Sequence, residues 1–184
     1  MIRPTAKTAP NNRTECNTRA IGTIYSDSLP IFIHEHVLEE ILDYSEQDCS
    51  KELGGFLIGG IHSEGKHDYV EVRQFLAAAE TESRVASLTF THNTWSAMNR
   101  TITEQFPDEH VLGWHHTHPD FGVFLSSYDM FIHRHFFPQP WQIALVVDPL
   151  RQELGFFQWR GKSVVDCGFV CVSQSNGGKE VVGK

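Results

Sequence analysis

The 184-residue sequence lacks long hydrophobic runs, and no apolar stretch approaches the roughly 18 residues that a membrane-spanning helix requires. Its first 20 residues, MIRPTAKTAPNNRTECNTRA, contain charged and polar side chains but no apolar segment of the kind found in a secretory signal. We therefore expect a cytoplasmic protein whose cysteines stay reduced.

Positive charge is also scarce. The 15 Lys and Arg residues are outnumbered by 23 Asp and Glu residues, the formal net charge is −8, and there is no basic run. This balance disfavours a nucleic-acid partner, because the phosphate backbone would be repelled. With 40% hydrophobic and 21% charged residues, the composition is typical of one globular domain with a substantial core.

Cysteine is sparse as well. Of four cysteines, only Cys167 and Cys171 lie close together, in the segment CGFVC. Spaced four apart in a predicted strand, they would face the same side and could form a metal-binding pair. Because the zinc-ribbon spacing is absent, we favour the interpretation that they pack as small hydrophobic side chains.

Composition and turn signals divide the chain into three parts. Residues 1–20 are rich in Thr, Asn and Pro and predict a disordered leader, whereas residues 173–184 predict a flexible tail. Between them, residues 21–172 predict a single α/β domain with a mixed central sheet flanked by helices. Helical spacing occurs at 31–48, at 92–106 and after Ser126, and strands are predicted at 54–60, 68–78, 87–91, 110–118, 141–149, 153–159 and 162–173.

Histidine is abundant instead, with 11 residues and three His-x-His pairs. The pairs at 34/36 and 133/135 fall in predicted helices, where residues two apart point about 200° apart and cannot converge on one ion. His116 and His118 end a predicted strand, where residues two apart share a face with Cα atoms about 6.6 Å apart. This is the only pair whose geometry suits a shared zinc ion.

Two residues could complete the ligand set. Asp129 lies eleven residues after His118, at the start of a predicted helix, and His133 lies one helical turn further on. In SSYD, Asp129 is also the acidic residue of an S-x-x-D helix start, and local sequence alone favours this capping role. Two His and one carboxylate would leave a fourth position open for water, which is the pattern of catalytic zinc.

These residues resemble a known signature. HTHPDFGVFLSSYD, from His116 to Asp129, is similar to the H-x-H-P-x6-S-x2-D motif of the JAMM, or MPN-plus, zinc metalloproteases. The family's upstream E-x-x-G-x-x-x-G segment is matched by ELGGFLIG, from Glu52 to Gly59, and ALVVDP is similar to the strand after the site. The resemblance spans residues 31–165 and implies a single MPN-type, cytidine-deaminase-like domain, similar to compact bacterial members.

The resemblance implies a zinc isopeptidase or peptidase that cleaves after the C-terminal glycine of ubiquitin or a ubiquitin-like protein. His116, His118 and Asp129 would bind one zinc ion. Glu52 would act as general base and then as general acid, and Ser126 would stabilise the oxyanion. The partners implied are ubiquitin or a ubiquitin-like protein, as a conjugate or a precursor.

Two features limit the resemblance. His115 stands where family members often have Tyr; next to His116 on a strand, it would face the opposite side and pack. The chain between Asp129 and VVDP is short and lacks the extra loop of some polyubiquitin-cleaving members, which argues against linkage-specific chain cleavage. We expect the substrate tail to bind as an extended strand in a groove flanked by residues 78–90.

Two alternative functions stay open. The protein could trim a sulfur-carrier protein fused to a biosynthetic partner, cleaving a peptide bond rather than a lysine isopeptide bond. It could also be a non-catalytic MPN scaffold subunit of a heterodimer, although its complete residue set disfavours this. An amidohydrolase barrel, which also uses His-x-His, is excluded because 184 residues cannot supply eight βα units.

Overall fold

The computed structural model describes residues 2–78, 82–84 and 87–175. The strands are β1 (Thr5–Ala6), β2 (Cys16–Ile21), β3 (Ile31–His34), β4 (Gly54–Glu64), β5 (His67–Ala77), β6 (Glu82–Arg84), β7 (Ser87–Thr89), β8 (His110–Thr117), β9 (Ile143–Asp148), β10 (Glu153–Arg160), β11 (Ser163–Cys167) and β12 (Phe169–Gln174). The helices are η1 (Pro10–Asn12), α1 (Glu35–Ser45), α2 (His92–Gln105) and α3 (Ser127–Phe136).

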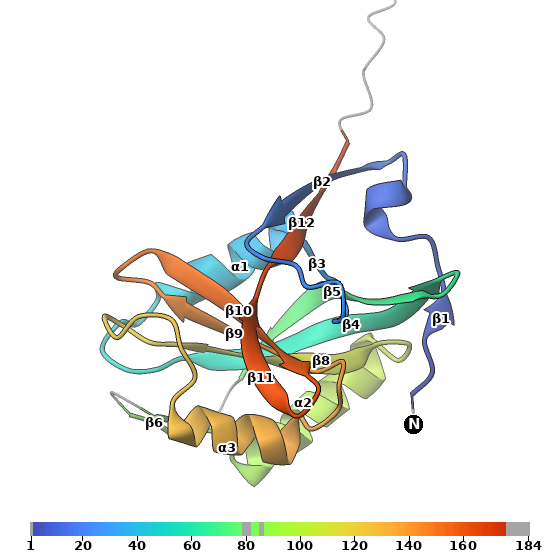
Figure 1. The fold of residues 1–184 in the computed structure, drawn as a ribbon. Helices are drawn as coiled ribbons and strands as arrows, with labels where there is room; N and C mark the ends of the chain where they lie inside the picture. The colour runs from blue at the N-terminus through green and yellow to red at the C-terminus, as the bar shows by residue number, and fades with distance from the viewer. Residues whose placement is uncertain (1, 79–81, 85–86, 176–184) are drawn as a thin grey trace, which may run out of the picture.

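One mixed sheet forms the centre of the domain (Figure 1). Its strands follow the order β11-β10-β9-β8-β4-β5-β3-β12-β2, and β1 pairs with the far end of β4. β6 and β7 form a separate two-stranded hairpin. Among the described helices, none is both long enough and apolar enough to cross a membrane.

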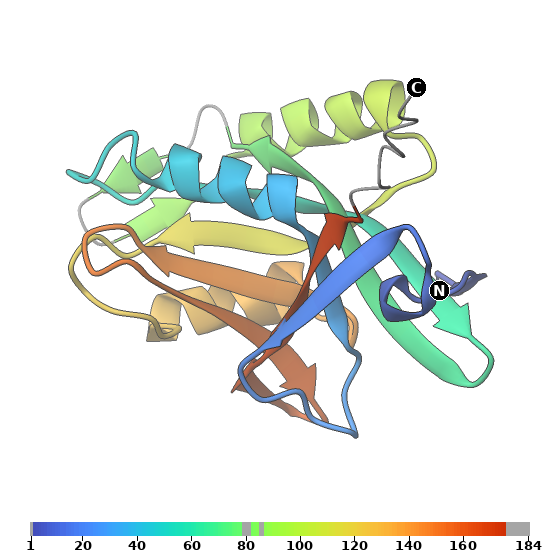
Figure 2. The same cartoon turned by 90° about the horizontal axis from the view of Figure 1, so that it is seen from above.

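Helices cover both faces of the sheet (Figures 1 and 2). Apolar residues four apart form an apolar stripe along α1. Its buried Val37 and Ile41 lie on one face of the sheet, in the same core cluster as Leu57 of β4. Met98 of α2 and Ile132 of α3 pack against the other face. This arrangement confirms the predicted α/β class with a mixed central sheet flanked by helices.

A single extra residue in β8 decides which face its later side chains reach. The pairing between β4 and β8 shifts at Leu112, which has no partner and forms a β-bulge. Leu112 packs with the α1 side of the core, yet Trp114, two residues later, packs with the α2–α3 side. Because strand side chains alternate with a period of two, the bulge reverses the faces and directs His116 toward α3.

The glycines of the ELGGFLIG segment have a packing role. A Cβ atom on Gly55 would lie 2.4 Å from the ring of Phe75, and one on Gly59 would lie 2.0 Å from the carbonyl oxygen of Glu71. Both distances are too short for any side chain, so only glycine lets β4 approach β5 this closely.

A buried carboxylate, Glu71 of β5, holds the N-terminal segment on the sheet. Arg13 contacts it with two nitrogens at 2.8 and 3.1 Å, and the Lys7 ammonium lies 2.8 Å away. His34 Nε2 and Arg73 Nη1 contact the same carboxylate at 2.9 and 3.0 Å. Burial alone would raise the pKa of Glu71, but hydrogen bonds from His34, Arg13 and Lys7 outweigh it and hold the pKa well below its usual range.

The predicted disordered leader over residues 1–20 is wrong for the residues that the structure describes. β1 pairs with β4, and β2 pairs along its whole length with β12 at the sheet edge. β2 leaves four of its six side chains exposed, so its sequence has no apolar alternation to reveal the strand. Most of the predicted flexible tail over 173–184 lies outside the described residues, although β12 extends to Gln174.

Two predicted elements have different boundaries. Ile31–His34, which falls within the predicted helical segment, is strand β3, and the helix begins only at Glu35. The single strand predicted at 162–173 is two strands, which pair with different neighbours on either side of Gly168. A Cβ atom on Gly168 would lie 2.5 Å from the carbonyl oxygen of Ile21, so the chain turns where only glycine fits.

Candidate metal centre

His116 and His118 lie at the end of β8, on the face that α3 covers. Their rings approach each other with 3.1 Å between the two Nε2 atoms, as expected for side chains two apart on a strand. The indole ring of Trp114 stacks on His116 with 4.3 Å between ring centroids and 12° between ring planes. This contact, which the sequence did not predict, fixes the plane of the imidazole.

Asp129 joins the two histidines from the first turn of α3. Its Oδ1 lies 3.4 Å from His116 Nε2, and its Oδ2 lies 3.4 Å from His118 Nε2. All three residues are buried, and one ligand atom from each lies within 4.8 Å of the others. Within the described part of the chain, this is the only group of three or more His, Cys, Asp or Glu residues arranged to hold a metal ion.

This donor set fits a zinc ion. Two ligands about 2.0–2.1 Å from a tetrahedral zinc would lie about 3.3 Å apart, close to the 3.1 Å that separates the Nε2 atoms of His116 and His118. Two imidazole nitrogens and one carboxylate, without cysteine, are the donors typical of catalytic rather than structural zinc. A shared cation would also satisfy acceptor lone pairs that otherwise face one another in a buried site.

Asp129 also caps α3, so the two interpretations that the sequence left open are compatible. Its backbone N–H donates to Ser126 Oγ at 3.2 Å, and its Oδ2 accepts from the Ser126 N–H at 2.7 Å, which completes a capping box. Oδ1 takes no part in the cap and lies toward His116. Because Ser126 Oγ acts as an acceptor in the cap, its own hydroxyl proton can be donated elsewhere.

Glu52 reaches the cluster although it precedes the first predicted ligand by 64 residues. The Leu53 N–H donates to Thr117 Oγ1 and the Thr117 N–H donates to the Leu53 carbonyl, each at 2.8 Å, so the contacts with β8 extend to Leu53, the residue next to Glu52. Glu52 Oε1 lies 3.9 Å from His118 Nε2, and the buried Oε2 has no hydrogen-bond partner among the residues that the structure describes. Burial raises the pKa of Glu52 to about 7; the charge of His118 opposes this shift, and that of Asp129 adds to it.

The pKa shifts of the three candidate ligands differ in direction. Burial would raise the pKa of Asp129, but hydrogen bonds with His116 and His118 hold that pKa well below its usual range, so the carboxylate stays ionised. Burial lowers the pKa of His116, which keeps a neutral imidazole lone pair. Burial also acts to lower the pKa of His118, but Asp129 and then Glu52 outweigh it and the net shift is upward.

The alternative ligand His133 is not part of the cluster. Its Nδ1 accepts a hydrogen bond from Trp114 Nε1 at 3.1 Å, so this atom takes part in the contact between β8 and α3. His115 faces the other side of β8, as predicted, and is buried beneath α1. Its Nε2 lies 3.1 Å from Ser45 Oγ, and its Nδ1 lies 3.2 Å from the Leu145 carbonyl oxygen.

Cys167 and Cys171 are buried in the core on the α1 side of the sheet. The Cys167 thiol lies 3.5 Å from the carbonyl oxygen of Phe156, and neither cysteine belongs to the group that could hold a metal. Their surroundings are those of packed hydrophobic side chains, the interpretation that the sequence favoured.

The groove predicted beside residues 78–90 falls on a segment whose residues 79–81 and 85–86 lie outside the described part of the chain. The segment starts next to the cluster, because the Ala78 N–H donates to the carbonyl of Gly54 at 2.9 Å, and Gly54 pairs with His116. The groove itself stays a prediction.

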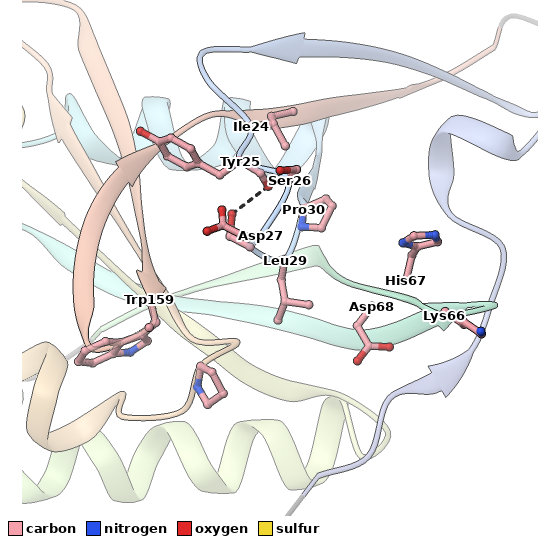
Figure 3. Close-up of a pocket in the computed structure, with 13 residues that line it drawn as sticks. Ile24, Tyr25, Ser26, Asp27, Leu29, Pro30, Lys66, His67, Asp68 and Trp159 are labelled. Carbon is pink, nitrogen blue, oxygen red and sulfur yellow. Dashed lines mark hydrogen bonds between the residues drawn. The ribbon is translucent and has the colours of Figure 1, made fainter.

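A hollow of about 580 Å³ lies elsewhere on the molecule (Figure 3). Tyr25 and Trp159 line one end of it, and His67 and Asp68 of the β4–β5 hairpin line the other. None of the residues of the candidate metal centre lines this hollow, so size alone does not locate the chemistry of the protein.

Comparison with protein families identifies the domain. Residues 26–137 match the family described as JAB1/Mov34/MPN/PAD-1 ubiquitin protease, which covers more than half of the chain. The chain belongs to this family. The matched segment includes Glu52, Ser126 and the three residues of the candidate metal centre.

Three curated relatives illustrate the similarity. Ubiquitin carboxyl-terminal hydrolase RPN11 of Saccharomyces cerevisiae is 27% identical over 138 residues, which cover 74% of this chain and 42% of that protein. COP9 signalosome complex subunit 5 of Caenorhabditis elegans is 30% identical over 111 residues, or 59% and 29% of the two chains. NAD(+) hydrolase TcpA of a Theionarchaea archaeon is 28% identical over 119 residues, or 64% and 33%. The chain thus spans less than half of each relative's length.

Proposed function

We propose that this protein is a zinc-dependent isopeptidase or peptidase that cleaves after the C-terminal glycine of ubiquitin or a ubiquitin-like protein. The observation that carries the proposal is the convergence of His116, His118, Asp129 and Glu52 in one buried corner of a domain from a ubiquitin protease family. Relatives named as a ubiquitin carboxyl-terminal hydrolase and a COP9 signalosome subunit support a substrate of this class.

In this proposal, His116, His118 and Asp129 hold the zinc ion. The chemistry that zinc supplies when bound is Lewis acidity, which polarises a carbonyl group and lowers the pKa of a water to about 7. Glu52 takes a proton from the attacking water and later gives it to the departing amine. A pKa raised to about 7 suits both transfers at neutral pH.

Ser126 has the proposed role of donating its hydroxyl proton to the oxyanion that develops on the scissile carbonyl. The capping box supports this role, because the bonds between Ser126 and Asp129 hold the hydroxyl at the start of α3, beside the proposed ligand. Removing one such donor typically costs about 10²–10³ in rate.

The orphaned oxygen of Glu52 favours an enzyme over a scaffold subunit. A buried carboxyl oxygen without a partner destabilises the fold, and a purely structural domain gains nothing from keeping it. The trimming of a sulfur-carrier fusion uses the same chemistry on a peptide bond. Only the substrate distinguishes it from deconjugation of a lysine isopeptide.

The decisive experiment is cleavage of a panel of ubiquitin and ubiquitin-like proteins, each as a C-terminal peptide fusion and as a lysine isopeptide conjugate. We expect cleavage of at least one substrate after its terminal glycine, loss of activity with a chelator, and recovery when zinc is restored. Failure of the zinc-reconstituted protein to bind or cleave any member of the panel would refute the proposal.

A further inference from the structure

Asp148, at the end of β9, is a buried carboxylate that the proposed mechanism does not use. Its Oδ1 accepts backbone N–H bonds from Asp120, Leu150 and Arg151 at 3.0, 3.1 and 3.1 Å, and its Oδ2 accepts one from Gly122 at 2.7 Å. The side chain is fully buried, and the Arg151 guanidinium lies 3.5 Å away. Four backbone donors therefore converge on one carboxylate.

Two of these donors belong to the loop of residues 118–122, in which Asp120 has a backbone conformation that is unfavourable for most side chains. Asp120 and Gly122 both have positive φ, at 64° and 85°, in the left-handed region that side chains other than those of Gly, Asn and Asp rarely adopt. Residues in such conformations persist where surrounding bonds hold them. Asp148 supplies these bonds on the inner side of the loop.

The same loop contacts the candidate metal centre through the carbonyl group of Gly122. The Gly122 carbonyl oxygen lies 3.2 Å from His118 Nδ1, and the His118 N–H donates to the Val147 carbonyl at 2.9 Å. A carbonyl can only accept, so the Gly122 contact requires the proton of a neutral His118 to sit on Nδ1. This leaves Nε2 as an acceptor, and Nε2 is the atom that faces His116.

We propose that Asp148 is a positioning residue for the candidate metal centre. Its carboxylate fixes Gly122, the Gly122 carbonyl fixes the His118 proton on Nδ1, and Nε2 is left with its lone pair directed at the metal position. The chain of contacts runs from Asp148 to the N–H of Gly122, and from the carbonyl of Gly122 to His118. The proposal rests on the zinc site of the proposed function but is testable without turnover.

The need for a carboxylate follows from the donors around it. Both oxygens of Asp148 face N–H groups, so an amide at this position would turn one N–H₂ toward another donor. If the amide introduced by Asp148→Asn kept its oxygen toward Asp120, Leu150 and Arg151, its nitrogen would face the Gly122 N–H and displace that peptide. The Gly122 carbonyl would then no longer hold the His118 ring.

The test compares Asp148→Asn with Asp120→Asn. The second variant is a matched control, because it weakens the exposed Asp120–Arg151 ion pair while keeping all four backbone bonds to Asp148 and a residue type that tolerates positive φ. The readouts are the His118 tautomer, from ¹⁵N NMR of zinc-free protein at alkaline pH, and zinc affinity from competition with a chelator.

We expect zinc-free wild type and Asp120→Asn to carry the His118 proton on Nδ1. Asp148→Asn should lose this preference and bind zinc about 10–100-fold more weakly, the usual cost of removing an outer partner of a metal ligand. Wild-type zinc affinity in Asp148→Asn, or an equal loss in Asp120→Asn, would overturn the proposal.

If Asp148→Asn does not fold, Asp148→Glu keeps the charge but displaces both oxygens, and we expect the same loss. A wild-type His118 protonated on Nε2 would overturn the proposal whatever the variants do. If only the proposed function is wrong, the result differs. Zinc affinity and the His118 tautomer would then change in the variants as expected, but the wild type would cleave no ubiquitin-like substrate.

Discussion

Glu52 and Glu71 are both buried, with 3% and 0% of their surfaces exposed, yet their surroundings differ in kind. Glu71 is contacted by Lys7, Arg13 and Arg73 at 2.8 to 3.0 Å, whereas among the described residues the nearest basic nitrogen to Glu52 is His118 Nε2 at 3.9 Å. The pKa of Glu71 is accordingly held well below its usual range, while burial raises that of Glu52 to about 7.

Burial alone therefore does not define a functional carboxylate. Glu71 has its charge matched and its oxygens hydrogen-bonded, so it stays ionised and holds the N-terminal segment in place. Within the described part of the chain, one oxygen of Glu52 has no hydrogen-bond partner, and with a pKa raised to about 7 the protonated and ionised forms are nearly balanced at neutral pH. The second environment suits proton transfer and the first suits structure.

The largest expected effect is on turnover in Glu52→Gln. Glutamine keeps the shape of the side chain but cannot take up a proton, so activity should fall by about 10²–10⁴-fold. Folding and zinc content should match those of the wild type, because Glu52 is not one of the three candidate ligands and its oxygen lies 3.9 Å from His118 Nε2. Turnover at the wild-type rate would remove Glu52 from the mechanism, and loss of zinc would make Glu52 a ligand.

The second prediction concerns Asp129, which has two roles. Asp129→Asn should lose zinc, measured by metal analysis after gentle purification, because the amide is a poor zinc ligand. The variant should lose about 0.5–2 kcal/mol of unfolding free energy, which is the usual effect of removing a helix cap. His133→Gln is the matched control on the same helix and should keep zinc; the reverse pattern would mean that His133 is the ligand.

The sequence was sufficient to bring His116 and His118 together, because the period of two in a strand places residues two apart on one face. It did not reveal the bulge at Leu112, which decides that this face is the one covered by α3. Bulges follow from pairing between strands and leave no mark in local composition. The proposed roles of the two histidines stay predictions.

Glu52 and β2 show why long-range pairing is the part that sequence patterns miss. Glu52 was singled out only through the family resemblance, because it is placed beside the cluster by its neighbour Leu53, which pairs with Thr117, 64 residues further along the chain. β2 was missed because an exposed edge strand needs no apolar alternation. Helices such as α2 could be predicted from the sequence, because the spacing of their apolar residues is a local pattern.

The third prediction tests the structural side of the comparison. Glu71→Gln leaves Lys7, Arg13 and Arg73 around a neutral side chain, and breaking a buried ion pair in this way costs about 3–5 kcal/mol in unfolding free energy. Zinc content should not change. Chemical denaturation measures the loss, and proteolysis after Arg13 reports release of the N-terminal segment.

Asp27→Asn is the control for Glu71→Gln, since it breaks an ion pair with Arg160 at the surface, where solvent screens the interaction. Its denaturation midpoint should match that of the wild type. If Glu71→Gln is as stable as Asp27→Asn, the ion-pair network around Glu71 contributes no more to the free energy of unfolding than an exposed ion pair does.

The smallest expected effect concerns His62, which is buried beside the same network. Arg73 Nη1 donates to its Nε2 at 2.8 Å, and burial, followed by the charges of Lys7 and Arg73, lowers its pKa to about 4. An unfolded histidine titrates near about 6.5, so between these values the unfolded chain binds a proton that the folded chain excludes. Stability should therefore fall as pH decreases from about 6.5 to 4, by up to about 1.4 kcal/mol per pH unit.

His62→Gln should remove this contribution and make the slope of unfolding free energy against pH shallower by about one proton between about pH 4 and 6.5. The slope should be reduced rather than abolished, because burial also lowers the pKa of His115 to about 3 and that of His133 to about 4. Glu71 enters this window only at its lower end, since its depressed pKa makes its contribution begin to fall near pH 4.5, the ordinary value of the carboxyl group, and vanish only at lower pH. His67→Gln, on the exposed hairpin, should keep the wild-type slope. An unchanged slope in His62→Gln would mean that His62 takes up its proton in the folded protein, and that the cations around Glu71 do not exclude it.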